Sequence, residues 1–181
     1  AQFKKVIEEY PGSDSVENSA SALGDILTEK GEYKQAVKIL EDILQKSDDD
    51  DFKKTIYKKI ADIYQELGHY DKALGYFGRA LGNTNNDFNA QVQFQIAECY
   101  ESRGKYNNSI AEYLKVGYLF PKSKYWSTRA HLRCAQIFEA QDRWLDAKKI
   151  YEKLTSEDIE EAKYARERLK WIEKHKEELG L

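Results

Sequence analysis

Apolar residues recur along most of the chain at steps of three and four positions, which is the spacing of residues on one face of an α-helix. The chain contains only 2 Pro and 10 Gly, so long stretches are free of helix breakers. The pattern predicts an all-α fold with helices over residues 1–9, 15–30, 33–46, 52–67, 70–82, 87–103, 106–119, 124–141, 144–155 and 157–178.

One arrangement of residues occurs four times. In its second copy it consists of Tyr57, Ile60, Ala61, Tyr64, Gly68, Tyr70, Ala73 and Phe77. The turn position holds Gly31, Gly68, Gly104 and Asp142, at intervals of 37, 36 and 38 residues. The first helices carry a small residue at one position, which lets paired helices approach closely: Gly24, Ala61, Ala97 and Ala135. We expect the aromatic residues at the repeated positions to form the core.

This arrangement resembles the tetratricopeptide repeat, and the resemblance covers nearly the whole chain. It implies an α-solenoid of stacked antiparallel helix pairs with a C-terminal capping helix, and a concave groove lined by the first helices. The expected divisions are the end of a truncated preceding repeat (1–14), four repeats (15–50, 51–86, 87–123 and 124–156) and the capping helix (157–181).

The ends of the chain and two of its loops suggest what kind of protein the chain comes from. Phe3 and Val6 align with Tyr113 and Val116, so the chain is expected to open inside the second helix of a repeat and to be a fragment without its own N-terminus. The loops at residues 10–13 and 120–123 and the ending at 162–169 are similar to bacterial envelope proteins of this class, such as the Tol–Pal coordinator and outer-membrane assembly lipoproteins. The compartment stays open between periplasm and cytoplasm.

The composition and the motifs of the sequence argue against several classes of function. There are 29 basic and 32 acidic residues, a net charge of −3, which argues against binding to nucleic acid. No apolar run approaches the roughly 20 residues that a membrane span needs, so no direct membrane insertion is expected from this segment. The three His residues fall in different units, and no catalytic or metal-binding motif occurs. We therefore expect no enzyme activity, no cofactor and no metal.

Three local features have structural explanations. We expect Cys99 and Cys134 to be small buried side chains. The acidic run of residues 48–51 lacks the spacing of a calcium loop, so Asp50 or Asp51 is expected to cap the helix that begins near Phe52. The Asn-rich segment 82–87 is expected to be a loop that ends in a helix cap.

The predicted groove carries a row of acidic residues. One position of the successive first helices holds Asp25, Asp62, Glu98 and Gln136. Three carboxylates in a row favour a basic or amide-rich ligand. The alternative is a solvated face whose carboxylates pair locally with lysines. Phe94 lies next to the row, either as an apolar anchor for a ligand or packed between units. The candidate contacts are Asp25, Lys58, Asp62, Phe94, Gln95, Glu98, Arg129 and Arg133.

A second hypothesis for the ligand of the groove depends on its basic residues. Residues 1–53 carry 7 basic and 13 acidic groups (net −6), residues 54–154 carry 16 and 11 (net +5), and residues 155–181 carry 6 and 8 (net −2). Some tetratricopeptide domains clamp the acidic C-terminal tails of heat-shock chaperones. That clamp, carried over by position, would use Lys58 and Asp62, then Gln95, then Arg129 and Arg133, although Asp62 would repel a carboxylate.

The sequence thus predicts a non-catalytic scaffold that binds a peptide or a partner's helix in its groove. Two alternatives stay open. One is the binding of an acidic C-terminal tail by a degenerate carboxylate clamp. The other is a structural role as a spacer or self-associating module, with a possible homo-oligomer.

Overall fold

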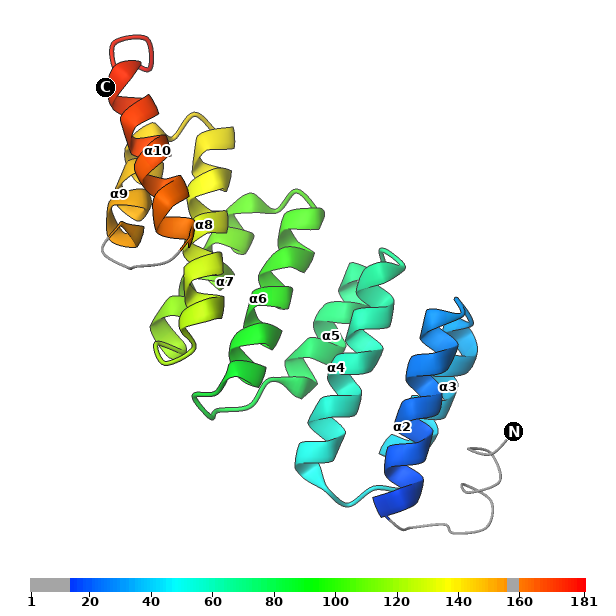
Figure 1. Cartoon of the computed structure of the whole chain (residues 1–181). Helices are drawn as coiled ribbons and strands as arrows, with labels where there is room; N and C mark the ends of the chain where they lie inside the picture. Colours follow the sequence, from blue (N-terminus) through cyan, green and yellow to red (C-terminus); the bar gives the residue numbers. More distant parts are fainter. Residues whose placement is uncertain (1–13, 156–159) are drawn as a thin grey trace. The chain divides into compact units, whose positions relative to one another are not determined.

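The computed structural model describes residues 14–155 and 160–181. The helix expected over residues 1–9, the register of Phe3 and Val6, and the start of the capping helix at 157 lie outside these residues. Within them the chain forms nine α-helices and no strand (Figure 1). They are α2 (Asp14–Glu29), α3 (Tyr33–Leu44), α4 (Asp50–Glu66), α5 (Tyr70–Ala80), α6 (Asp87–Ser102), α7 (Tyr106–Leu119), α8 (Lys124–Ala140), α9 (Trp144–Leu154) and α10 (Glu160–Lys174).

The helices pack as consecutive pairs in two units. The first unit ends at Gly82 and holds the pairs α2 with α3 and α4 with α5, joined by contacts between α3 and α4. The second unit begins at Asn83 and holds the pairs α6 with α7 and α8 with α9, while α10 packs on α9 and α8. The predicted all-α fold of helix pairs with a C-terminal capping helix is confirmed.

The turn within each pair is built in the same way four times. Gly31, Gly68 and Gly104 have φ of 73°, 72° and 69°, a left-handed conformation that favours glycine, and Asp142 adopts it with φ of 57°. In each turn the N–H of the next residue donates to a carbonyl five positions back, as in His69 N to Tyr64 O at 2.8 Å. This bond ends the first helix and directs the chain into the second.

The repeated positions form the core. Leu40, Phe77, Tyr113 and Tyr151 occupy the same position in successive second helices, and none is more than 1% exposed. The small residues opposite them are also needed. A Cβ atom on Gly24 would lie 2.7 Å from Cδ2 of Leu40, so no larger residue fits there without a shift. The prediction that the repeated small residues lie in the core is confirmed, as is that for the aromatic residues of this second-helix position. It is wrong for Tyr106, which is 44% exposed at the start of α7.

Two local predictions need correction, and a third agrees with the structure. The cap of α4 is Asp49, not Asp50 or Asp51, because the helix begins two residues earlier than expected. Asp50 and Asp51 lie in the first turn, where their charge favours the positive helix end. The capping helix α10 ends at Lys174 rather than at 178, so His175 follows the helix instead of lying within it. The N-cap expected in segment 82–87 is Asn86, whose side chain accepts a bond from Asn89 N.

Removing the α4 cap should cost stability. The Asp49 carboxylate accepts hydrogen bonds from Asp51 N at 2.8 Å and Phe52 N at 3.0 Å. We expect Asp49→Ala to lower the free energy of unfolding by about 1 kcal/mol, because these two amides lose their partner. Urea denaturation followed by circular dichroism measures it. Asp48→Ala removes the same charge without a cap and should change stability by less than about 0.5 kcal/mol; equal effects would contradict the capping assignment.

Two further findings concern the two cysteines and the possibility of a membrane-spanning helix. Cys99 and Cys134 are buried thiols, as expected for small buried side chains. None of the helices over residues 14–155 and 160–181 combines the length and the apolar character that crossing a membrane requires.

Candidate functional site

The acidic residues of the first unit are paired with lysines. The Lys59 ammonium lies 2.5 Å from Asp25 Oδ1 and joins α4 to α2, and Lys58 Nζ lies 2.8 Å from Asp62 Oδ2 along α4. Half of the Asp25 side chain remains exposed, at 51%. This arrangement is the solvated face that was the alternative to an acidic groove. A basic ligand would have to displace Lys58 and Lys59 to reach these carboxylates.

In the second unit, a row of polar side chains, exposed or partly exposed, runs along α8. Tyr125, Arg129, Arg133 and Gln136 follow one another at steps of four, four and three residues, which places them on one side of the helix. We call these four residues the α8 face. Tyr125 is 57% exposed, and both arginines are exposed. The face presents two guanidinium groups and one aromatic ring to solvent.

Arg129 is held in place by aromatic rings. Its guanidinium carbon lies 5.2 Å from the Tyr125 ring centroid, 5.6 Å from that of Phe94 and 5.7 Å from that of Trp126. It also donates a hydrogen bond to the Tyr125 hydroxyl. Within residues 14–155 and 160–181, no carboxylate forms an ion pair with Arg129. The guanidinium is therefore oriented before any ligand arrives, and its charge is not neutralised.

Phe94 is part of this support and is not an exposed anchor. Its side chain is only 2% exposed, and its ring centroid lies 5.0 Å from that of Tyr113 and 5.3 Å from that of Trp126. It therefore packs between α6, α7 and α8, the second of its two alternatives. A ring this buried favours packing between helices over direct contact with a ligand.

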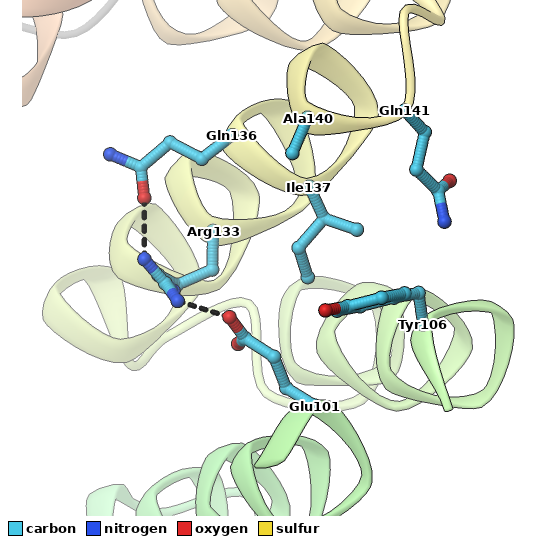
Figure 2. Close-up of a pocket in the computed structure, with 7 residues that line it drawn as sticks. All are labelled: Glu101, Tyr106, Arg133, Gln136, Ile137, Ala140 and Gln141. Atoms are coloured by element: carbon cyan, nitrogen blue, oxygen red, sulfur yellow. Dashed lines mark hydrogen bonds and ion pairs between the residues drawn. The ribbon is translucent and has the colours of Figure 1, made fainter. Parts of the chain in front are cut away.

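Arg133 is the second cation of the α8 face and is engaged within the unit. It pairs with Glu101 of α6, and its Nη1 donates to Gln136 Oε1 at 2.9 Å (Figure 2). Glu101 is fixed in turn by the buried Tyr113 hydroxyl, which donates to Glu101 Oε2 at 2.8 Å. Burial, with the nearby Glu101 carboxylate, raises the pKa of Tyr113 well above its usual value. Tyr113 therefore stays a hydrogen-bond donor at all physiological pH values.

A pocket of about 270 Å³ opens beside the Arg133–Glu101 pair. Figure 2 shows Tyr106 at the start of α7 on one side and the α8 side chains on the other. Ile137 is 4% exposed and forms part of the apolar wall, while Gln136 and Gln141 supply amides. The full lining is Glu101, Tyr106, Arg133, Gln136, Ile137, Ala140 and Gln141. This recess could receive one side chain of a bound segment.

The structure distributes the eight predicted contacts over both units. Asp25, Lys58 and Asp62 lie in the first unit, and the other five lie in the second. Gln95 and Glu98 are partly buried on α6. Sequence reasoning missed Tyr125, Tyr106, Glu101 and Ile137. Tyr125 could have been found from its four-residue spacing to Arg129, whereas the others follow only from how α6, α7 and α8 pack. No group of His, Cys, Asp or Glu among the described residues could hold a metal ion.

Two family models match the sequence. The model described as tetratricopeptide repeat matches residues 15–86, and the model described as soluble NSF attachment protein matches residues 81–167. No curated protein matches the chain significantly. Together the two models span both structural units.

Solved structures of repeat proteins are similar in fold. A protein of Podosopora anserina assigned as a kinesin light chain, with nearly identical TPR-like repeats, is 14% identical; the match covers 83% of this chain and 79% of that one, with a TM-score of 0.67. MamA is 18% identical, with 92% and 85% covered and a TM-score of 0.66. YrrB, described as a TPR protein with an unusual peptide-binding site, is 17% identical, with 91% and 80% covered and a TM-score of 0.62.

These matches agree with the repeat found in the sequence and with the helix pairs that it forms. Stacked repeats of this kind form extended concave surfaces that repeat proteins use for binding. None of the matches bears on the predicted bacterial envelope type, which stays a prediction. Residues 15–86 match the tetratricopeptide-repeat model, and the described helix pairs have the fold of tetratricopeptide-repeat structures.

Proposed function

We propose that this chain is a non-catalytic scaffold that binds an extended peptide segment of a partner protein along the α8 face. The observation that carries the proposal is the state of Arg129, an exposed guanidinium oriented by three aromatic rings and not neutralised by any described carboxylate. The peptide-binding site named in the description of YrrB supports this class of ligand. The Arg129 position favours a segment with an Asp, a Glu or a C-terminal carboxylate.

The mechanism is preorganised display. A guanidinium that already rests on aromatic rings loses little side-chain entropy when it binds a carboxylate, and its five donors match the two oxygens of that group. Arg133 would contribute less, because a ligand carboxylate must compete with Glu101 for it. Arginine and tyrosine at the centre of an interface commonly provide most of the binding energy. We therefore expect Arg129 and Tyr125 to be the main contacts.

The pocket beside Arg133 would take a neighbouring side chain of the same segment. Its wall of Ile137 and Ala140 suits a small apolar group, and the amides of Gln136 and Gln141 suit an amide or hydroxyl at its rim. Gln95 and Glu98 on α6 stay candidates for further contacts. Such a pocket would give the scaffold selectivity, because a side chain larger than the recess would not be accommodated.

The first unit is a weaker candidate for direct contacts. A partner that reached it would meet Asp25 and Asp62 already paired with Lys59 and Lys58, so each contact there requires an ion pair to separate. The same pairing limits the carboxylate-clamp alternative. Lys58 is engaged by Asp62, and our proposal retains only Arg129 and Arg133 from that set.

Peptide selection followed by measured affinities tests the proposal. A random peptide library displayed on phage should yield segments with an acidic residue when it is panned against the full chain. We expect Arg129→Ala to weaken binding of a selected peptide at least tenfold, about 1.4 kcal/mol, in fluorescence anisotropy titrations. Arg143→Ala is the matched control, since Arg143 also rests on a ring, 4.4 Å from Phe138, and lies outside the α8 face. Equal affinities for both variants would contradict the proposal.

Self-association is the second candidate function. The observation that favours it is a set of exposed apolar side chains on α7: Leu114 at 39%, Tyr118 at 84% and Leu119 at 46%. Sedimentation equilibrium across a concentration series separates the two functions. An oligomer that forms at micromolar protein concentration, and that the Tyr118→Ala variant no longer forms, would support self-association.

A further inference from the structure

A second recess of the second unit lies where α7, α8 and α9 meet, and its volume is about 170 Å³. Its polar lining consists of Lys124, Ser127, Thr128 and His131 from α8 and Lys153 from α9. None of the described residues that line it is acidic. The recess therefore combines two ammonium groups and two hydroxyl groups, which can donate hydrogen bonds to an anion, with an imidazole.

His131 is fixed at the inner side of this recess. It is 7% exposed, and its Nδ1 lies 2.8 Å from the Ser127 carbonyl oxygen, to which it donates. In the neutral ring Nε2 is then an acceptor, and the Lys153 ammonium donates to it from 3.0 Å. Burial and the neighbouring Lys153 charge lower the pKa of His131. The neutral ring thus accepts a hydrogen bond from Lys153, whose own side chain is exposed.

The backbone of α7 is adapted to this ring. A Cβ atom on Gly117 would lie 2.5 Å from Cε1 of His131 and 3.0 Å from its Nε2. Glycine inside a helix is less favourable than alanine. Its presence in α7 therefore provides the space for the imidazole, and the recess depends on the pair Gly117 and His131.

We propose that this recess binds a phosphate group, with Lys153 and Lys124 as the charged ligands and the Ser127 and Thr128 hydroxyls as neutral donors. Two ammonium groups match the double negative charge of phosphate. The volume equals that of about five waters at ~30 Å³ each, which is enough for its five heavy atoms. This site is separate from the α8 face and does not depend on the function proposed there.

Binding would be coupled to protonation of His131. When Lys153 turns its N–H groups to the anion, Nε2 loses its donor and can accept a proton, which the adjacent negative charge stabilises. Among the described residues that line the recess, the charged ones beside His131 are Lys153 from α9 and Lys124 on its own helix, while α7 presents the uncharged Gly117. The anion should therefore raise the pKa of His131, and a dianion that does not titrate, such as sulfate, should bind more tightly at pH 5.5 than at pH 7.5.

The test follows the imidazole signal of His131 by NMR while sodium phosphate is added to the full chain at constant ionic strength. We expect a saturable shift, weakened at least tenfold in Lys153→Gln. Lys149→Gln, an exposed lysine of the same helix outside the recess, should titrate like the wild type. A shift that does not saturate, or equal titrations of the two variants, would overturn the proposal.

A second arm identifies the source of the phosphate. O-phosphoserine that binds as tightly as inorganic phosphate, and loses affinity in Lys153→Gln, would assign the recess to phosphorylated side chains. Binding of O-phosphoserine more than tenfold weaker than that of inorganic phosphate would assign it to the free ion. Both results support a phosphate site, and failure of both ligands rejects it.

Discussion

Replacing Phe77 by Ala is expected to lower the free energy of unfolding of the first unit by about 3–5 kcal/mol. The Phe77 ring is fully buried in α5, at the position that Leu40 occupies in the preceding helix pair. Removing the ring loses its burial and leaves a cavity that the neighbouring helices fill only in part. In a repeat protein a loss of this size affects the unit in which it occurs, because each repeat contacts only its neighbours. Urea denaturation followed by circular dichroism measures the loss.

The matched control removes an aromatic ring that is not buried. Tyr118 is 84% exposed on α7, so Tyr118→Ala should change the free energy of unfolding by less than about 0.5 kcal/mol. If Phe77→Ala were as mild as this control, the repeated aromatic position would not be a core position. The alignment of the four copies would then be wrong.

Gly117→Ala is expected to destabilise the second unit by about 1–3 kcal/mol. The added methyl group would overlap the His131 ring at 2.5 Å, and the ring cannot move freely because Ser127 and Lys153 hold it. This effect opposes the usual gain from replacing a helical glycine by alanine, about 1 kcal/mol. Thermal or urea denaturation of the single variant measures the net result.

Two glycines of α5 provide the comparison. A Cβ atom on Gly75 or Gly78 would meet no atom within 4 Å, so Gly75→Ala and Gly78→Ala should stabilise the chain by up to about 1 kcal/mol each. A second variant, Gly117→Ala with His131→Ala, should recover part of the loss because the clash is removed. Stabilisation by Gly117→Ala alone would show that the ring is not confined as the structure indicates.

The architecture could be predicted from the sequence because it depends on backbone conformation and on side-chain size. A left-handed turn accepts few residues, so Gly31, Gly68 and Gly104 marked the turns directly, and Asp142 could be placed only because it falls at the same interval. The close approach at Gly24 depends on size in the same way. Such constraints act within one repeat, and a fourfold repetition makes them easy to detect.

The chemistry of the exposed surfaces could be predicted only in part, because it depends on side-chain contacts between different helices. Nothing in the sequence around Asp25 identifies Lys59 of α4 as its partner. Phe94 is covered by Tyr113 and Trp126, which belong to later helices. The α4 cap fell on Asp49 because four consecutive aspartates offer equivalent capping groups, and the choice depends on where the helix begins.

The position of a bound peptide on the chain tests the central claim most directly. Backbone amide shifts should be recorded by NMR while a selected acidic peptide is titrated into the full chain. Our account predicts that the largest changes fall on the α8 face, at Arg129 and Arg133, and at Tyr106 across the pocket. Changes confined to the first unit or to the exposed side of α7 around Tyr118, with α8 unaffected, would contradict it.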